Sequence, residues 1–220
     1  MVVIFTPLRG LFFVETVVIN YFVKKISAKE AKRYIHENHY SHGSHNSPSP
    51  CYGLFDGEEL IGCLMFATPC SENVRSSVFG PEYKDNVTEL HRLHIKDVTP
   101  KNTESWFISR CLKQLKIDKP QIWGVVSFAD NTEGHKGTIY KATNAIRAGE
   151  TGSANFYIDT EGRLRHPRQC GVNITEDNKP EGWTKVRRAA KSRFLFLVPN
   201  DKRHKKQLLD LLTEKYKLSI

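Results

Sequence analysis

Two side chains with acid–base potential, Asp130 and Tyr140, lie close together in the sequence. Asp130 follows an apolar run at 122–128, rich in β-branched residues, that predicts a buried strand. Tyr140 lies in a short helical pattern that reaches Ile146, with Gly149 where a C-cap glycine is expected. Ligands of open α/β sheets bind beyond the carboxyl ends of strands, so both groups lie where proton transfer would occur. The alternative is an aspartate that caps a turn and a half-buried tyrosine.

A second pattern with chemical potential combines an arginine strand and a helix start. The alternating stretch 87–95 predicts a strand that contains Arg92, and 105–116 predicts an amphipathic helix that begins at Ser105 and is capped by Ser105 or Thr103. Free N–H groups at a helix start bind anions, so the pair is a candidate phosphate site. The alternative is a surface arginine before an ordinary capped helix.

Histidines recur at every third position from His36 through His39 and His42 to His45, and Tyr40 follows one of them. This spacing can gather ring nitrogens over a helix end, and imidazole suits iron, zinc or copper. A solvated histidine-rich loop would give the same pattern.

Basic residues dominate two stretches near the C-terminus, 163–169 and 185–193, in a chain of 220 residues with a net charge of +9. Such a charge favours a polyanionic partner, either nucleic acid or an acidic membrane surface. Arginine and amide side chains contact phosphates and read base edges, which favours nucleic acid over a role in solubility alone. The predicted DNA contacts are Arg163, Arg165, Arg168, Gln169, Arg187 and Arg188.

The elements that must position these groups follow one another from residue 21. A strand at 21–26 leads into a helix at 28–38, which Ser27 and Glu30 begin as a capping box. Two strands at 51–55 and 60–67 flank Asp56-Gly57, a strong hairpin signal. Short strands at 155–158 and 194–198 and a terminal helix at 202–216 complete the pattern. We therefore predict an α/β (α+β) fold whose central, mostly antiparallel twisted sheet is flanked by helices, as one domain at 21–220.

The remaining signals concern the compartment. Residues 1–20 are apolar but interrupted by Arg9 and Glu15, so we expect an N-terminal extension and no membrane span. The five cysteines form no C-x-x-C pair, which is typical of reduced core residues in a cytoplasmic protein.

The element order resembles the GNAT (N-acyltransferase) fold, and several segments resemble the phage Mom family. These segments are Y-F-V-K at 21–24, H-Y-S at 39–41, R-L-H-I at 92–95, S-W-F-I-S-R at 105–110, W-G-V-V-S-F-A-D-N-T-E-G-H at 123–135, G-T-I-Y-K-A-T-N at 137–144 and G-R-L-R-H-P-R-Q at 162–169. The resemblance implies a GNAT-like enzyme that converts adenine N6 in phage DNA to a carbamoylmethyl-type adduct, which shields the DNA from host restriction in the bacterial cytoplasm.

The resemblance also assigns roles to residues. It implies that Arg92, Ser105, Asp130 and Tyr140 are catalytic, that Arg92, Ser105 and Trp106 bind the cofactor, and that His39 and Tyr40 belong to an iron-linked site. Asp130 would be a general base or an acceptor for the N6 amino hydrogens, and Tyr140 a general acid. Double-stranded DNA is the implied partner, with Tyr157 or Trp183 stacked on a displaced base. The oligomeric state stays open, a homodimer included.

The donor is also open. The GNAT pyrophosphate loop, R-x-x-G-x-G/A, is absent, because 96–104 contains no glycine. Acetyl-CoA and an aminoacyl ester on tRNA are both compatible with the sequence. Two competing functions also remain: a GNAT-type acyltransferase for tRNA, protein or a small amine, and a DNA-binding module without catalysis.

Overall fold

The computed structural model of the protein describes residues 4–8, 11–15, 20–69, 71–134, 136–167 and 173–216. The chain forms two compact units, Met1–Val125 with Leu197–Ile220 and, between them, Val126–Phe196. The division runs through strands β7 (Gly124–Ala129) and β12 (Ser192–Leu197), so each of these strands contributes residues to both units.

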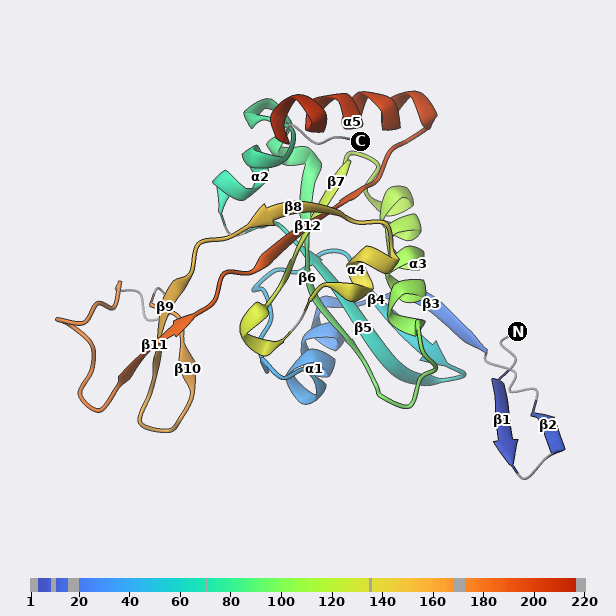
Figure 1. The fold of residues 1–220 in the computed structure, drawn as a ribbon, viewed down its shortest axis with the longest axis horizontal. Coiled ribbons are helices and arrows are strands. Elements are labelled where there is room, and N and C mark those ends of the chain that lie inside the picture. The colour runs from blue at the N-terminus through green and yellow to red at the C-terminus, as the bar shows by residue number, and fades with distance from the viewer. Residues whose placement is uncertain are drawn as a thin grey trace. The chain divides into compact units, whose positions relative to one another are not determined.

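The first unit contains four neighbouring strands in the order β3 (Tyr21–Ile26), β4 (Cys51–Asp56), β5 (Glu59–Ala67) and β6 (Val87–Ile95) (Figure 1). All three pairings are antiparallel. The predicted hairpin forms between β4 and β5, and Gly57 adopts the positive φ of 56° that its turn needs. The predicted strands at 21–26 and 87–95 are confirmed.

Helix α1 (Ala28–Asn38) covers one face of these strands. It begins as predicted at Ser27, whose hydroxyl accepts the Glu30 N–H at 3.1 Å. Its apolar side, with Ile35 fully buried, packs into a core with Cys63 and Met65 of β5.

Helix α3 (Thr103–Asp118) covers the opposite face. Tyr52 of β4, which is fully buried, donates to Asp118 at 3.0 Å, and Lys25 of β3 pairs with the same carboxylate at 3.2 Å. Successive residues of a strand point to opposite faces, so Tyr52 packs against α3 and its neighbour Cys51 packs against α1.

The first unit is completed by elements at its ends and between β5 and β6. Helix α2 (Glu72–Phe79) and the 3-10 helix η1 (Pro81–Asn86) occupy a polar stretch that has no clear periodicity. Helix α5 (Lys202–Tyr216) has the predicted bounds, and β1 (Ile4–Leu8) pairs with β2 (Leu11–Glu15) in an antiparallel hairpin. No helix among the described residues combines the length and apolar character needed to cross a bilayer.

The second unit contains the order β7-β12-β8, with β8 at Ile146–Glu150. It also contains a three-stranded antiparallel sheet in the order β10 (Leu164–Arg165), β9 (Ala154–Ile158) and β11 (Thr184–Arg188) (Figure 1). The predicted fold class, a mixed α/β arrangement of mainly antiparallel strands with flanking helices, is confirmed.

One predicted element is wrong. The expected helix through Ile146 is shorter, because α4 (Thr138–Ala142) ends where Asn144 turns into the left-handed region at φ 59°. Ile146 then starts β8, and Gly149 (φ 93°) lies within this strand instead of capping the helix. A register shift between β12 and β8 accommodates it.

Candidate functional site

Asp130 directly follows β7, as predicted, and begins the 3-10 helix η2 (Asn131–Glu133). Its Oδ1 accepts the Thr132 N–H at 3.1 Å, so the residue does cap a turn. The side chain is only 9% exposed. A buried carboxylate needs compensating partners, which the second unit provides.

Two cations bind the other oxygen of this carboxylate. Oδ2 of Asp130 accepts Arg188 Nη2 at 3.0 Å and Lys191 Nζ at 3.1 Å. Burial alone raises the pKa of Asp130, but the hydrogen bond and charge of Lys191, the charge of Arg188 and the Thr132 N–H together lower it below its ordinary value. Asp130 is therefore a fixed anion, which makes it a weak proton acceptor and a strong hydrogen-bond acceptor. Since a carboxylate oxygen can accept two bonds, Oδ1 keeps one acceptor position beyond the Thr132 N–H as far as the described residues are concerned.

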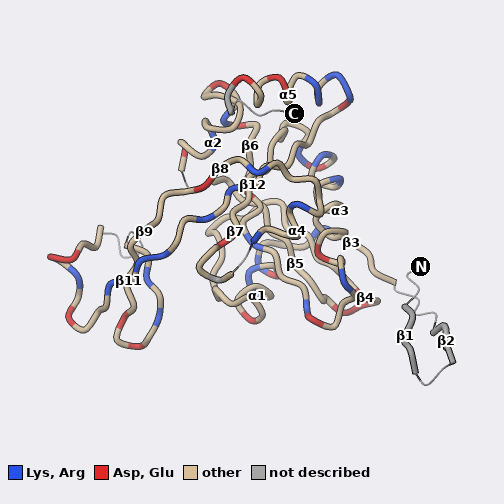
Figure 2. The backbone as a smooth tube through the Cα atoms, in the orientation of Figure 1, with Lys and Arg blue, Asp and Glu red and all other residues tan. Residues whose placement is uncertain are grey.

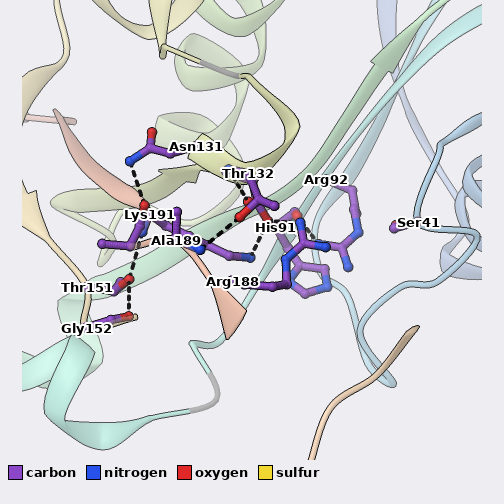
Figure 3. Close-up of polar contacts among 12 residues, drawn as sticks. Ser41, His91, Arg92, Asn131, Thr132, Thr151, Gly152, Arg188, Ala189 and Lys191 are labelled. Carbon is purple, nitrogen blue, oxygen red and sulfur yellow. Dashed lines mark hydrogen bonds and ion pairs between the residues drawn. The ribbon is translucent and has the colours of Figure 1, made fainter. Parts of the chain in front are cut away.

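The turn after Asp130 is fixed against residues 189–192. The Thr132 hydroxyl accepts the Ala189 N–H at 3.0 Å, and the Asn131 amide donates to the Ala190 carbonyl at 2.5 Å (Figure 3). Ser192 donates to Asn131 at 3.3 Å. These bonds hold the carboxylate in one position, as a site that orients a ligand requires.

Tyr140 belongs to α4 and is buried against β12, the strand that also contains Ser192. Its ring packs on Phe194 at 5.3 Å and on Phe196 at 5.8 Å between centroids. Ser192, Phe194 and Phe196 are every second residue of β12 and therefore lie on one face of it. Ser192, which contacts Asn131, is roughly 7–13 Å along the strand from the two phenylalanines that contact the Tyr140 ring. Gly137, at φ 67°, precedes α4 where an added Cβ would lie 2.3 Å from the Phe194 ring. Only glycine fits this approach.

The predicted DNA-contacting arginines have different partners. Arg163 Nε and Arg165 Nη2 bind Asp159 Oδ2 at 3.0 and 2.8 Å, and Arg188 binds Asp130. Burial raises the pKa of Asp159, but the backbone and side-chain bonds of Arg163 and Arg165 lower it far below its usual range. Arg187 instead donates to the Ser153 hydroxyl at 2.8 Å. Basic residues thus line the β9–β11 sheet (Figure 2), but three of the four arginines described have acidic partners.

Some of the predicted nucleic-acid contacts are not available in this role or are not described. Arg168 and Gln169 lie outside the described residues. Tyr157 is 2% exposed, so the prediction that it stacks on a displaced base is wrong. Trp183 is half-buried.

The predicted cofactor residues belong to the first unit and contact the protein itself. Arg92 donates from Nε to the Gly43 carbonyl at 2.9 Å and from Nη1 to the His91 carbonyl at 2.8 Å. Figure 3 shows Arg92 beside His91. The hydroxyl of Ser105 donates to the Asn102 carbonyl at 3.0 Å. Both of the Arg92 contacts are to carbonyl groups of the protein's own backbone.

The start of α3 differs from the predicted cap. Asn102, at φ 72°, is the N-cap, and its own side chain makes no capping hydrogen bond. Thr103 and Ser105 hydroxyls donate to carbonyls instead of accepting N–H groups. Trp106 lies under the Arg110 guanidinium at 5.3 Å. Together with the glycine-free loop before α3, these contacts do not fit a GNAT-type pyrophosphate cradle.

The predicted iron-linked residues do not fit a metal site either. His39 is buried and stacks on Tyr40 at 4.3 Å, whereas Tyr40 is 56% exposed. The Ser41 N–H donates to His39 Nδ1 at 3.1 Å, so that nitrogen carries no proton and the neutral ring is protonated at Nε2. Across the described ranges, no three or more His, Cys, Asp or Glu side chains could hold a metal ion together.

Several residues of the site were missed at the sequence level. Lys191, Thr132 and Asp159 each make a central contact. In the sequence they appear only as hydroxyl, acidic and basic residues among others of the same kinds. Such a pattern does not reveal which residues pair, and Lys191 and Asp130 are 61 positions apart.

The solved structures to which the chain shows a partial likeness include N-acetyltransferases. They include yncA, a putative acetyltransferase from Salmonella typhimurium (TM-score 0.47, 8% identity, 83% of this chain and 96% of that chain). A chimera of spermidine N-acetyltransferase SpeG from Vibrio cholerae gives a TM-score of 0.48 at 10% identity, over 86% of this chain and 98% of that chain. These likenesses concern the chain path alone.

The chain belongs to the Mom protein family, whose model matches residues 20–217. It is 32% identical over 139 residues to methylcarbamoylase Mom of Escherichia phage Mu. That match covers 63% of this chain and 58% of the phage Mu protein, so the chain spans little more than half the length of this relative. The predicted resemblance is confirmed.

Proposed function

We propose that this protein is a phage DNA-modification enzyme that adds a carbamoylmethyl group to adenine N6, and that the modification protects phage DNA from host restriction endonucleases in the bacterial cytoplasm. Family membership supports the proposal, as does the name of the phage Mu relative, a methylcarbamoylase. The observation that carries it is the anchored Asp130 anion at the end of β7.

Asp130 acts by accepting an N6–H bond and orienting the amino group. Its lowered pKa favours this role over that of a general base, and the position left on Oδ1 would receive the hydrogen. The N6 lone pair is delocalised into the adenine ring, so orienting the group against the donor is a large part of the task. Tyr140 is the proposed proton donor to the leaving group.

Duplex DNA has to expose its adenine. Displacing one base costs about a few kcal/mol, which binding to the DNA backbone must supply. Exposed basic side chains of the sheet that contains β9 and β11, such as Lys185, can supply it. The donor is an acyl or aminoacyl carrier, and the misfit of the α3 start to a pyrophosphate cradle favours aminoacyl-tRNA over acetyl-CoA. Glycyl transfer from an aminoacyl ester would release the tRNA hydroxyl and give an N6-aminoacetyl group, which has the same atoms as a carbamoylmethyl group but is joined through its carbonyl carbon. The proposed reaction therefore includes an isomerisation, whereas acetyl-CoA does not supply the amide nitrogen.

Nucleoside mass spectrometry of plasmid DNA from cells that express the protein tests the proposal. We expect a deoxyadenosine derivative in which one hydrogen is replaced by a carbamoylmethyl group, together with resistance of the plasmid to restriction enzymes whose sites contain adenine. The same plasmid from cells with an empty vector is the control. Unmodified DNA, or a modified tRNA in its place, would overturn the assignment.

One specific observation favours a second candidate. Asp130 caps η2 and pairs with Arg188, both of which are structural contacts. They would also be present in a DNA-binding module without catalysis. In that case Asp130→Asn would bind DNA as the unchanged protein does, and neither would modify it.

A further inference from the structure

The β9 and β11 strands form a two-stranded ribbon over part of their length. β10 pairs only with Tyr157 and Ile158, so Ala154, Asn155 and Phe156 have β11 as their neighbour within the three-stranded sheet. B-DNA has a major groove about 12 Å wide, which admits a two-stranded β-ribbon. The end of the sheet that lies next to residues 151–153 therefore has a suitable width.

Two exposed polar side chains lie opposite each other on this ribbon. Asn155 of β9 and Arg187 of β11 are direct partners in the antiparallel register, and both are exposed. Directly opposed residues project from the same face of a sheet. Lys185 shares this face because it lies two residues from Arg187.

Arg187 has the partner that a base-reading arginine needs. Its Nε and Nη2 donate to the Ser153 hydroxyl at 3.2 and 2.8 Å. Within the described part of the chain, Arg163, Arg165 and Arg188 form ion pairs with Asp159 or Asp130, whereas no ion pair is found for Arg187. A neutral hydroxyl orients the guanidinium and leaves its charge and remaining N–H groups for a ligand.

The next residue links this face to the candidate site. Arg188 binds Asp130 at 3.0 Å, and adjacent residues of a strand point to opposite faces. The ribbon is therefore anchored at Arg188. Arg187, the preceding residue, lies about 3.3 Å away along the strand and points to the opposite face.

We propose that Arg187 and Asn155 read base edges in the major groove beside the modified adenine and so determine the flanking sequence. Arginine pairs with O6 and N7 of guanine, and asparagine pairs with N6 and N7 of adenine. Lys185 contacts a phosphate and contributes no sequence preference. The inference rests on the proposed function, because it concerns the DNA that the same site modifies.

The test is to sequence the neighbours of modified adenines in plasmid DNA from cells that express each variant. Arg187→Lys keeps the charge and removes the planar fork of donors, and Asn155→Ala removes the amide. A good bidentate contact discriminates roughly 5- to 150-fold between bases, so each variant should lose a preference of that order at one flanking position. Lys185→Gln is the matched control from the same face, and should lower the total modification at all flanking sequences alike. Ser153→Ala, which releases the guanidinium without changing it, should weaken the same preference as Arg187→Lys.

Nucleoside mass spectrometry of each DNA separates the possible failures. Unmodified DNA from the unchanged protein would overturn the proposed function, and this inference with it. Modified DNA without flanking preference, or with the same preference in Arg187→Lys, Asn155→Ala and Ser153→Ala, would overturn the reading role alone. Melting temperatures near that of the unchanged protein ensure that the variants compared are folded.

Discussion

The guanidinium of Arg188 lies 3.0 Å from the carboxylate of Asp130, and the two side chains are only 13% and 9% exposed. This ion pair joins the end of β7 to β11 within the second unit. Burying two charges is costly unless hydrogen bonds satisfy them, and Lys191 and the Thr132 N–H add to the pair. The contact is thus both a structural link and the feature that keeps Asp130 ionised.

Asp130→Asn should destabilise the protein. The change preserves shape but leaves the Arg188 charge without its anion, at a cost of about 1–3 kcal/mol in the free energy of unfolding. Urea denaturation measures this cost. Asp177→Asn, at an exposed acid in the same unit, is the matched control and should change stability by less than about 0.5 kcal/mol. Equal stabilities of the two variants would show that the ion pair contributes little.

Stability should fall in acid in a way that depends on Asp130. Its folded pKa lies below the ordinary value, so its contribution is complete above the unfolded pKa of about 3.9 and is lost as the pH falls through the folded pKa. Urea midpoints measured from about pH 6 to about pH 3 should therefore decline less in Asp130→Asn than in the unchanged protein. Parallel declines would mean that the carboxylate titrates normally.

Lys185 and Arg165 should affect DNA binding differently. Each phosphate contact contributes about −0.9 to the slope of log affinity against log salt for duplex DNA, so Lys185→Gln should reduce the magnitude of that slope by up to this amount. Arg165→Gln should leave the slope nearly unchanged and lower Tm, because Arg165 binds the buried Asp159. Fluorescence titrations of labelled duplex at several salt concentrations give the slopes. The opposite order of effects would show that the Asp159 pair opens on binding.

Gly137→Ala should destabilise α4 more than Gly134→Ala does. Both glycines have positive φ, 67° and 74°, so alanine is strained by about 1–2 kcal/mol at either position. Only at Gly137 would the new Cβ also meet the Phe194 ring, at 2.3 Å, while nothing lies within 4 Å at Gly134. Thermal melts of the two variants compare these costs directly. A Tm of Gly137→Ala equal to that of the control would mean that the Phe194 ring moves aside easily.

The elements predicted correctly are those with local signals. The Ser27 cap, the Asp56-Gly57 turn and the terminal helix at 202–216 each depend on residues a few positions apart, and each appears in the structure. The helix after Asp130 was overextended because its apolar spacing continued past Asn144, whose left-handed φ ends the helix. Helical periodicity does not detect a single residue of this kind.

The site could be predicted only as far as its strand end. Asp130 follows from the apolar run before it, but its partners Arg188 and Lys191 come from a segment that the register of β11 and β12 brings back. The sequence predicts DNA contacts for these basic residues, because it does not distinguish an arginine that pairs with an acid from an arginine that is free to bind DNA. Tertiary pairing distinguishes them, because it gives Arg163, Arg165 and Arg188 acidic partners.

The central claim is that Asp130 and Tyr140 act in adenine modification, and the most direct measurement is the amount of modified deoxyadenosine in DNA from cells expressing Asp130→Asn, Tyr140→Phe or the unchanged protein. Tyr140→Phe keeps the ring against Phe194 and Phe196, so it should fold with a loss of about 1 kcal/mol or less. We predict modified nucleoside with the unchanged protein and none with either folded variant. Normal amounts with both variants, at normal protein levels, would contradict the claim.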